Sequence, residues 1–279
     1  MKQISYEMIE NFRNFLLNEE KSQATQEKYI RDITSFVKWN MCQEITKPRV
    51  LEYKEYLMSS YAPASVNSIL SSLNSFFMFY EWYDLRVKFL KLQKQIFANK
   101  EKELTKAEYE RLLMAAKAKG NRKLYYMMQT ICSTGIRVSE LKFITLESLK
   151  KKQAVINLKG KTRVIIIPDF LCKLLLKYTK EQRIETGAVF ISKNGKAMDR
   201  SNVWRLMKNL CESANVSKEK VFPHNLRHLF ARTYYSMQKD IVRLADILGH
   251  TSINTTRIYT METGDVHRRQ IQKLGLLRC

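Results

Sequence analysis

Apolar residues recur at helical spacing through the first 85 residues of the chain. Ile9, Phe12 and Leu16, for example, lie three or four positions apart and share one face of a helix. The spacing predicts four helices, over residues 5–18, over residues 22–40, from Lys47-Pro48 onward, and from Pro63 to about Tyr83. No strand pattern interrupts them, so residues 1–85 are expected to form a four-helix domain.

The predicted fourth helix has a polar face of amides and hydroxyls. These residues are Asn67, Ser68, Ser71, Ser72, Asn74 and Ser75. Uncharged donors of this kind bind phosphate oxygens. A plain solvated helix face explains the pattern equally well, so both interpretations stay open.

A lysine-rich segment, residues 86–103, follows without a clear apolar stripe, and we interpret it as a basic linker. Thr105 and Glu108 then have the spacing of a capping box. A second domain is therefore expected over residues 104–279.

The hydrophobic period changes within this second domain. Runs rich in β-branched residues at 154–158 and 163–167 flank a Lys-Gly-Lys turn and predict an antiparallel hairpin, and residues 189–191 resemble a further short strand. Helices are predicted over residues 105–118, 121–133, 169–180, 201–214, 224–237, 240–248 and 252–260. The predicted fold is mainly α, with a helical N-terminal domain and a mainly helical second domain that carries a small antiparallel β-sheet.

The chain ends in an apolar stripe that has no obvious partner surface. It predicts a tail helix between Gly264 and Cys279 through Val266, Ile271, Leu274, Leu276 and Leu277.

The formal net charge of the chain is +22, and this charge is unevenly distributed along the sequence. Residues 1–98 carry 13 Lys and Arg against 11 Asp and Glu, whereas the remaining residues carry 36 against 16. A fold does not need such an excess, which adds self-repulsion. A polyanionic partner, nucleic acid, is favoured over a merely solvated basic surface.

The five cysteines are scattered and form no C-x-x-C pair, which is typical of a reduced, cytosolic chain without disulfides or structural zinc. The N-terminus lacks an apolar signal core. No run of about 18 apolar residues is present, so no membrane-spanning helix is expected.

Groups that bind anions and transfer protons are concentrated in residues 222–259. The segment holds three of the four histidines, one arginine beside them and a late tyrosine: His224, Arg227, His228, His250 and Tyr259. Such a set suits a phosphate held by cations and attacked by an oxygen nucleophile. His224 and His228 also have the i, i+4 spacing of a metal pair, but Asn225 stands where a metalloprotease needs glutamate, and no third ligand is evident. We therefore expect no metal site, and His228 is expected to be structural.

Arg137 follows the helix-ending Thr134-Gly135, with Glu140 three residues later. Alone, such a pair is weak evidence, because most are surface ion pairs of little consequence. Arg163 and Arg257 are most simply phosphate-positioning or solvated charges.

Five motifs in one order, however, closely resemble the tyrosine recombinases, the family of phage integrases and Xer-type resolvases. They are T-G-I-R-V-S-E-L, the lysine-bearing hairpin, H-N-L-R-H, L-G-H-T-S and T-T-R-I-Y-T. The first domain resembles the core-binding domain of the simpler two-domain members, and no arm-binding domain is expected in front of it.

The resemblance implies a role for each matching residue. Tyr259 would attack a DNA phosphate and leave a 3′-phosphotyrosyl link with a free 5′-hydroxyl. Arg137 and Arg227 would grip the non-bridging oxygens, and His250 would donate a further hydrogen bond. His224 would accept the tyrosine proton or assist the grip.

Two supporting roles complete the implied site. Glu140 would hold Arg137, and Lys159 would protonate the departing 5′ oxygen. Family hairpins usually present this lysine in a Gly-Lys-Gly setting, whereas Leu158 precedes Lys159 here. Lys161 is therefore the alternative general acid, and Lys159 is preferred because it directly precedes the tip glycine.

The resemblance further implies the reaction and its partners. A phosphotyrosyl bond keeps much of the free energy of the phosphodiester, so strands are rejoined without a cofactor. Double-stranded DNA is the expected substrate, bound by a homotetramer on two recombination sites, with a related recombinase or accessory protein as a further possible partner. A cytoplasmic, nucleoid-associated location is expected. The alternatives are a type IB topoisomerase and a catalytically silent DNA-binding protein.

Overall fold

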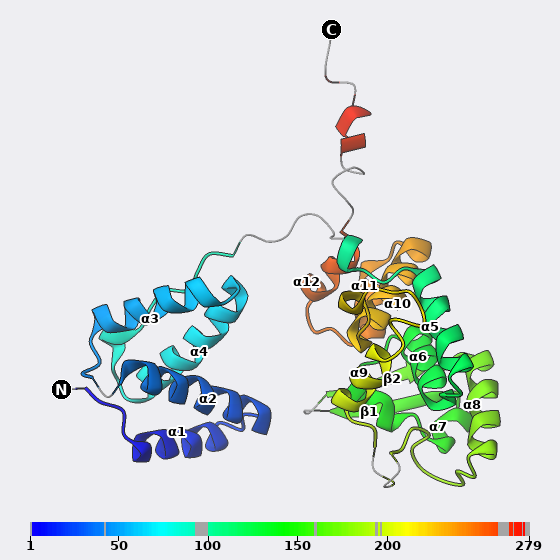
Figure 1. Ribbon diagram of the computed structural model, residues 1–279, viewed down its shortest axis with the longest axis horizontal. Coiled ribbons are helices and arrows are strands. Elements are labelled where there is room, and N and C mark those ends of the chain that lie inside the picture. The colour runs from blue at the N-terminus through cyan, green and yellow to red at the C-terminus, as the bar shows by residue number, and fades with distance from the viewer. Residues whose placement is uncertain are drawn as a thin grey trace. The chain divides into compact units, whose positions relative to one another are not determined.

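The computed structural model describes residues 2–41, 43–92, 100–158, 161–192, 195, 197–261, 268–269, 271–274 and 276. The chain divides into two compact units, Met1–Lys94 and Gln95–Cys279 (Figure 1). Each unit is mainly helical, and the one sheet among the described residues is a two-stranded antiparallel hairpin. The predicted fold class is confirmed.

The first unit packs four helices around an aromatic core. They are α1 (Tyr6–Asn18), α2 (Gln23–Asn40), α3 (Lys47–Ser60) and α4 (Pro63–Phe79), followed by the short 3-10 turn η1 (Tyr83–Leu85). Phe12, Phe36 and Phe76 are fully buried, which is the driving force for packing the predicted apolar stripes together. Helix α4 ends earlier than predicted, and Glu81 two residues later has a left-handed φ of 57°.

The polar face of α4 is used inside the first unit. The Asn74 side chain donates to the Val87 carbonyl at 2.8 Å and accepts from the Val87 amide at 3.0 Å, and Asn67 makes the same pair of bonds to Leu90. Buried Ser72 donates to Asp32 at 2.8 Å. The expected phosphate-binding or solvated role is therefore wrong for these three residues, because backbone groups and a carboxylate of the same unit take their hydrogen bonds.

The same bonds change the start of the predicted linker. Val87 is 5% exposed and lies in the core of the first unit, and Leu90 packs against that core. The segment from residue 86 to Leu90 therefore belongs to the first unit.

The second unit is built around α6, which contacts α5, α8, α9 and α10 (Figure 1). Its elements are η2 (Lys100–Lys102), α5 (Lys106–Ala118), α6 (Arg122–Thr134), η3 (Val138–Phe143), α7 (Leu146–Lys150), β1 (Gln153–Leu158), β2 (Lys161–Ile166), α8 (Asp169–Glu181), α9 (Arg200–Lys208), η4 (Lys218–Lys220), α10 (Pro223–Gln238), α11 (Ile241–Leu248), α12 (Ile253–Thr256) and η5 (Arg257–Tyr259). The predicted capping box opens α5, since the Glu108 amide donates to Thr105 Oγ1 and the Thr105 amide to Glu108 Oε2.

Two local predictions in this unit are wrong. In the described part of residues 188–197, isolated bridges pair Thr145 with Ala188 and Ile191 with Ala197, so the expected third strand does not form. Helix α9 ends at Lys208, six residues earlier than predicted, and turns follow.

The hairpin pairs Gln153 with Ile166 at one end and Leu158 with Lys161 at the other. The Lys159 prediction lies outside the described residues, as does the side chain of Lys161. In the predicted tail helix, Ile271, Leu274 and Leu276 are exposed. Val266 and Leu277 lie outside the described residues. No helix within the described ranges is long and apolar enough to cross a bilayer.

Candidate functional site

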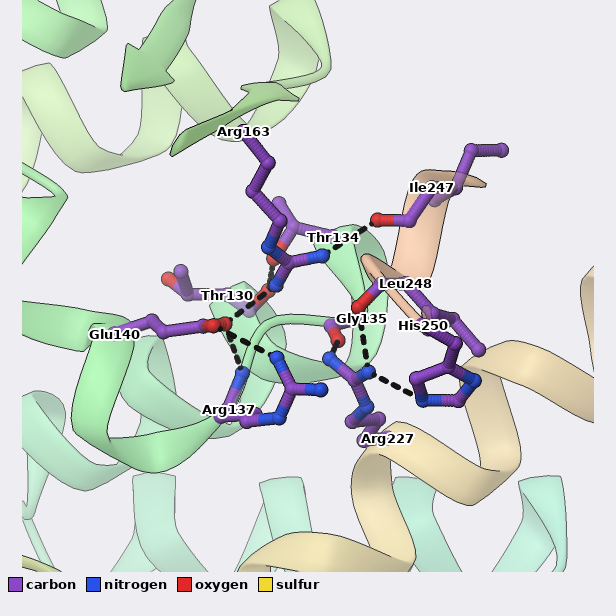
Figure 2. A network of polar contacts seen from close by, with 10 residues as sticks. All are labelled: Thr130, Thr134, Gly135, Arg137, Glu140, Arg163, Arg227, Ile247, Leu248 and His250. Atoms are coloured by element: carbon purple, nitrogen blue, oxygen red, sulfur yellow. Dashed lines mark hydrogen bonds and ion pairs between the residues drawn. The ribbon is translucent and has the colours of Figure 1, made fainter. Parts of the chain in front are cut away.

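Arg227, on α10, lies at the centre of a cluster of charged and polar side chains (Figure 2). It is 1% exposed, and its guanidinium donates to the Gly135 carbonyl at 2.6 Å and to the Leu248 carbonyl at 2.7 Å. Its Nη2 also lies 3.0 Å from His250 Nε2. Burial, with the nearby positive charge of Arg137, lowers the pKa of Arg227 to about 10, so it stays charged at neutral pH.

Gly135 explains why the T-G-I-R motif needs glycine. It ends α6 in the left-handed region, with a φ of 67°, and a Cβ there would lie 2.5 Å from the Phe230 ring. The resulting close approach of α6 to α10 brings the Gly135 carbonyl to Arg227.

Arg137 is the N-cap residue directly before η3 and is fixed by Glu140, which is 2% exposed. Glu140 Oε2 accepts from the Arg137 amide at 2.7 Å, and Oε1 accepts from Arg137 Nη1 at 3.0 Å. The Arg137 side chain is nevertheless 42% exposed. The pair thus holds one guanidinium in place with an accessible face.

Arg163 extends from β2 to the same carboxylate. Its Nη2 lies 2.5 Å from Glu140 Oε2, and its Nη1 donates to the Ile247 carbonyl at 2.7 Å. The side chain is only 15% exposed. Arg163 is therefore not a solvated charge, and Figure 2 shows its guanidinium between Glu140 and the end of α11.

His250 follows Gly249, the residue that caps the end of α11, and its two ring nitrogens have different partners. Nδ1 lies 2.8 Å from Thr256 Oγ1, and Nε2 faces the Arg227 guanidinium. Because arginine only donates, Nε2 is the acceptor and Nδ1 carries the hydrogen. Burial and the neighbouring Arg227 lower the pKa of His250 to about 4, which agrees with a neutral ring.

Tyr259 closes the site from η5 and is 4% exposed. Its ring centroid lies 6.2 Å from that of His250 and 5.0 Å from that of His228. Burial raises the pKa of the Tyr259 hydroxyl, and the positive charge of Arg227 opposes that rise. The phenol therefore needs a proton acceptor to become a nucleophile at neutral pH.

The other two histidines line up along α10 toward Tyr259. The His224 and His228 ring centroids lie 4.6 Å apart, so the His228 ring contacts both His224 and Tyr259. Burial lowers the pKa of both, that of His228 to about 4. Among the described residues, no group of three or more His, Cys, Asp and Glu side chains is placed to hold a metal ion.

A cleft of about 970 Å³ opens beside these groups. Its lining includes Arg137, Glu140, Arg163, Gly249 and His250. It provides space for a ligand next to the exposed face of the Arg137 guanidinium.

The fold brings Arg137, Glu140, Arg227, His250 and Tyr259 together from four separate segments. His224 contacts His228, and His228 in turn contacts the Tyr259 ring. Lys159 and the side chain of Lys161 lie outside the described residues.

Thr256 had no role predicted from sequence, and Arg163 was predicted only as a phosphate-positioning or solvated charge. The buried Thr256 hydroxyl accepts the hydrogen bond from His250 Nδ1, while Arg227 fixes the tautomer. A polar residue three positions before Tyr259 was a weak signal for this contact, and nothing in the local sequence of Arg163 indicates its partners.

Comparisons with known proteins agree with this geometry. Residues 102–264 match the model of the Phage integrase family, and residues 8–84 match the phage integrase N-terminal SAM-like domain. The chain is 28% identical to tyrosine recombinase XerA of Thermococcus kodakarensis, with 97% of this chain and 96% of that protein covered. It is 29% identical to tyrosine recombinase XerD of Listeria monocytogenes, with coverage of 92% and 94%.

Solved structures share the fold. A lambda integrase dimer bound to a COC′ core site gives a TM-score of 0.74 at 19% identity, covering 94% of this chain and 97% of that one. A lambda integrase tetramer bound to a Holliday junction gives 0.71 at 19% identity, covering 91% and 76%. These matches do not favour a topoisomerase or a silent DNA-binding protein. The chain belongs to the phage integrase family and is a tyrosine recombinase, an enzyme of DNA strand breakage and rejoining.

Proposed function

We propose that this site cleaves and rejoins duplex DNA at specific sites, with Tyr259 as the nucleophile. The observation that carries the proposal is the convergence of Arg137, Arg227 and His250 beside the Tyr259 ring, in a chain of this family. Two cations and an imidazole next to a phenol suit a phosphate that gains negative charge as it is attacked.

The phosphate would lie against Arg137 and Arg227. The Arg137 guanidinium has an accessible face, and in the described part of the chain the buried Arg227 Nε has no acceptor. A guanidinium meets two phosphate oxygens at once, and both arginines remain charged through the reaction.

His250 changes state in this scheme. Its Nε2 accepts from Arg227 in the free protein, so donation to a phosphate requires a proton on Nε2. A bound phosphate supplies the nearby negative charge that raises the pKa of an imidazole. Substrate binding is therefore expected to promote protonation of His250.

The chemical step is a transesterification. The Tyr259 oxygen forms a bond to phosphorus while the bond from phosphorus to the 5′ oxygen breaks. The phenolic proton passes to His224 or to water, and Lys159, with Lys161 as the alternative, supplies a proton to the 5′ oxygen. One phosphoester replaces another, so rejoining is the reverse step and needs no nucleotide.

Tyr259 is only 4% exposed in the free protein, so we expect η5 to move before a DNA phosphate reaches the hydroxyl. The segment between His250 and Tyr259 contains only short helical turns. Cleavage is therefore expected to follow a conformational step on DNA.

Trapping of a covalent adduct tests the function. Purified protein is incubated with nicked fragments of genomic DNA from its own source, denatured, and recovered with any DNA that remains attached. Wild type is expected to retain protease-sensitive adducts at a defined sequence, and Tyr259→Phe none. Equal recovery with both proteins, or adducts without sequence preference, would refute site-specific cleavage by Tyr259.

The proposed substrate complex is a homotetramer on two duplex sites, alone or with a related recombinase or accessory protein. The basic charge of residues 99–279 and the exposed tail residues Ile271, Leu274 and Leu276 support it, as does the lambda integrase tetramer on a Holliday junction. DNA as the substrate would place the enzyme in the cytoplasm, with the nucleoid. Normal assembly and recombination by a protein truncated after Met261 would argue against a role for the tail.

A further inference from the structure

We infer that Arg163 is a positioning residue that ties the β-hairpin to two of the phosphate-binding groups, Arg137 and His250. The inference rests on the proposed function. Three independent contacts of one side chain support it.

The first contact acts on Arg137 through Glu140. Glu140 Oε2 is shared by the Arg137 amide, at 2.7 Å, and Arg163 Nη2, at 2.5 Å. Since Glu140 Oε1 holds the Arg137 guanidinium, a shift of the carboxylate moves that guanidinium too. Arg163 therefore fixes the carboxylate from the side opposite Arg137 (Figure 2).

The second contact acts on the end of α11. The last carbonyls of a helix have no partner within it and require outside donors. Arg163 donates to Ile247 and Arg227 to Leu248, so two arginines from different elements cap consecutive carbonyls. His250 lies two residues after Leu248. The two arginines therefore fix the backbone from which the His250 ring extends.

The third contact is steric and involves Gly249. A Cβ at Gly249 would lie 2.5 Å from Arg163 Cδ, and the residue has a left-handed φ of 64°. Glycine thus permits the Arg163 side chain to pass against the backbone of the turn. The position of the Arg163 side chain therefore requires glycine at position 249 of the turn.

Because Arg163 lies on the β-hairpin, its contacts couple the hairpin to Glu140 and to the end of α11. It lies on β2 opposite Ile156, two residues after Lys161 and four after Lys159. Its partners are 23 and 84 residues away in the chain. Displacement of the strand that carries Arg163 is therefore transmitted to Glu140 and to the His250 turn, which links the hairpin to the phosphate-binding groups.

Arg163→Lys tests the inference, because lysine keeps the charge but has no planar fork to span Glu140 and the Ile247 carbonyl. The matched control is Arg243→Lys on α11, where the arginine is 66% exposed and faces Asp240. Single-turnover cleavage is measured on the nicked duplex recovered by adduct trapping. Arg163→Lys is expected to cleave about 10–100-fold more slowly, with DNA affinity within about threefold of wild type. Arg243→Lys is expected to match wild type.

A duplex with a methylphosphonate at the scissile position separates positioning from general destabilisation. Its phosphorus lacks one negative oxygen, so cleavage depends less on the arginine clamp. The rate ratio of wild type to Arg163→Lys is expected to shrink at least fivefold on this duplex, with rates compared well below both melting temperatures. A ratio that stays the same, or a rate within threefold of wild type on normal DNA, overturns the inference. If the wild-type protein itself forms no Tyr259-dependent adduct, that result refutes the proposed function rather than the role of Arg163.

Discussion

Replacement of Glu140 by glutamine tests the central contact of the site with little change of shape. The amide oxygen can take the place of Oε2 and keep both of its donors, while the amide nitrogen then faces Arg137 Nη1. Replacing one oxygen by nitrogen thus removes the hydrogen bond from Arg137 Nη1. It also removes the negative charge that strengthens the two remaining hydrogen bonds.

The expected loss of stability follows from these three bonds. A hydrogen bond to a charged group contributes about 1.5–3 kcal/mol and a neutral one about 0.5–1.5 kcal/mol, so each retained bond weakens by about 1 kcal/mol. The bond from Arg137 Nη1 is lost, and because the Arg137 side chain is 42% exposed, water weakens this bond, so its loss removes only about 1 kcal/mol more. The sum of about 3 kcal/mol lies at the lower edge of the roughly 3–5 kcal/mol for breaking a buried ion pair.

Thermal unfolding without DNA measures this loss. For a unit of this size, 1 kcal/mol shifts the melting temperature by roughly 2–4 °C, so Glu140→Gln is expected to melt about 6–12 °C lower. Glu181→Gln removes one partner of the surface pair with Arg122 in the same unit and is expected to lose below about 1 kcal/mol. Single-turnover cleavage by Glu140→Gln should also fall about 10–100-fold, because Arg137 is released.

One result would refute the reasoning. If Glu140→Gln melts within about 2 °C of wild type and cleaves at the wild-type rate, the carboxylate does not fix Arg137. The contacts of the free protein would then have no bearing on the reaction.

Three further predictions follow from single contacts. Gly249→Ala is expected to lose about 2 kcal/mol of unfolding free energy through φ strain and contact with Arg163. The control Gly120→Ala, with a φ of 65° and open space around it, should lose only the contribution of the φ strain. Equal losses for the two variants in chemical denaturation would contradict this prediction. The folded-state pKa of His250, about 4, lies below its unfolded value of about 6.5, so its stabilisation is present above pH 6.5 and is lost as pH falls toward 4. Melting temperatures across this window should depend less on pH in His250→Gln, and an unchanged slope would be evidence against it. Asn74→Ala leaves two backbone groups of the 86–90 segment without partners and should destabilise the first unit by about 1–3 kcal/mol, so a neutral effect would contradict the assignment of that segment.

The sequence by itself determined the elements and the order of the motifs. Apolar spacing of three and four residues predicts α1 to α4, and the Thr105 capping box predicts the start of α5, because these signals depend on neighbouring residues alone. The roles of Tyr259, Arg227 and Arg137 were predicted from the order of five motifs, which resembles that of the tyrosine recombinases, and not from any single local setting.

Only the tertiary structure decided which donor meets which acceptor. Asn67 and Asn74 were expected to be surface amides, yet they bind the backbone of residues 86–90. Arg163 was expected to be a phosphate-positioning or solvated charge, yet it binds Glu140 and the end of α11. The neutral state of His250 likewise depends on an arginine from another helix. Periodicity encodes the face of an element that is buried, but not the partner that covers it. That partner depends on how segments far apart in the chain pack, which no local pattern specifies.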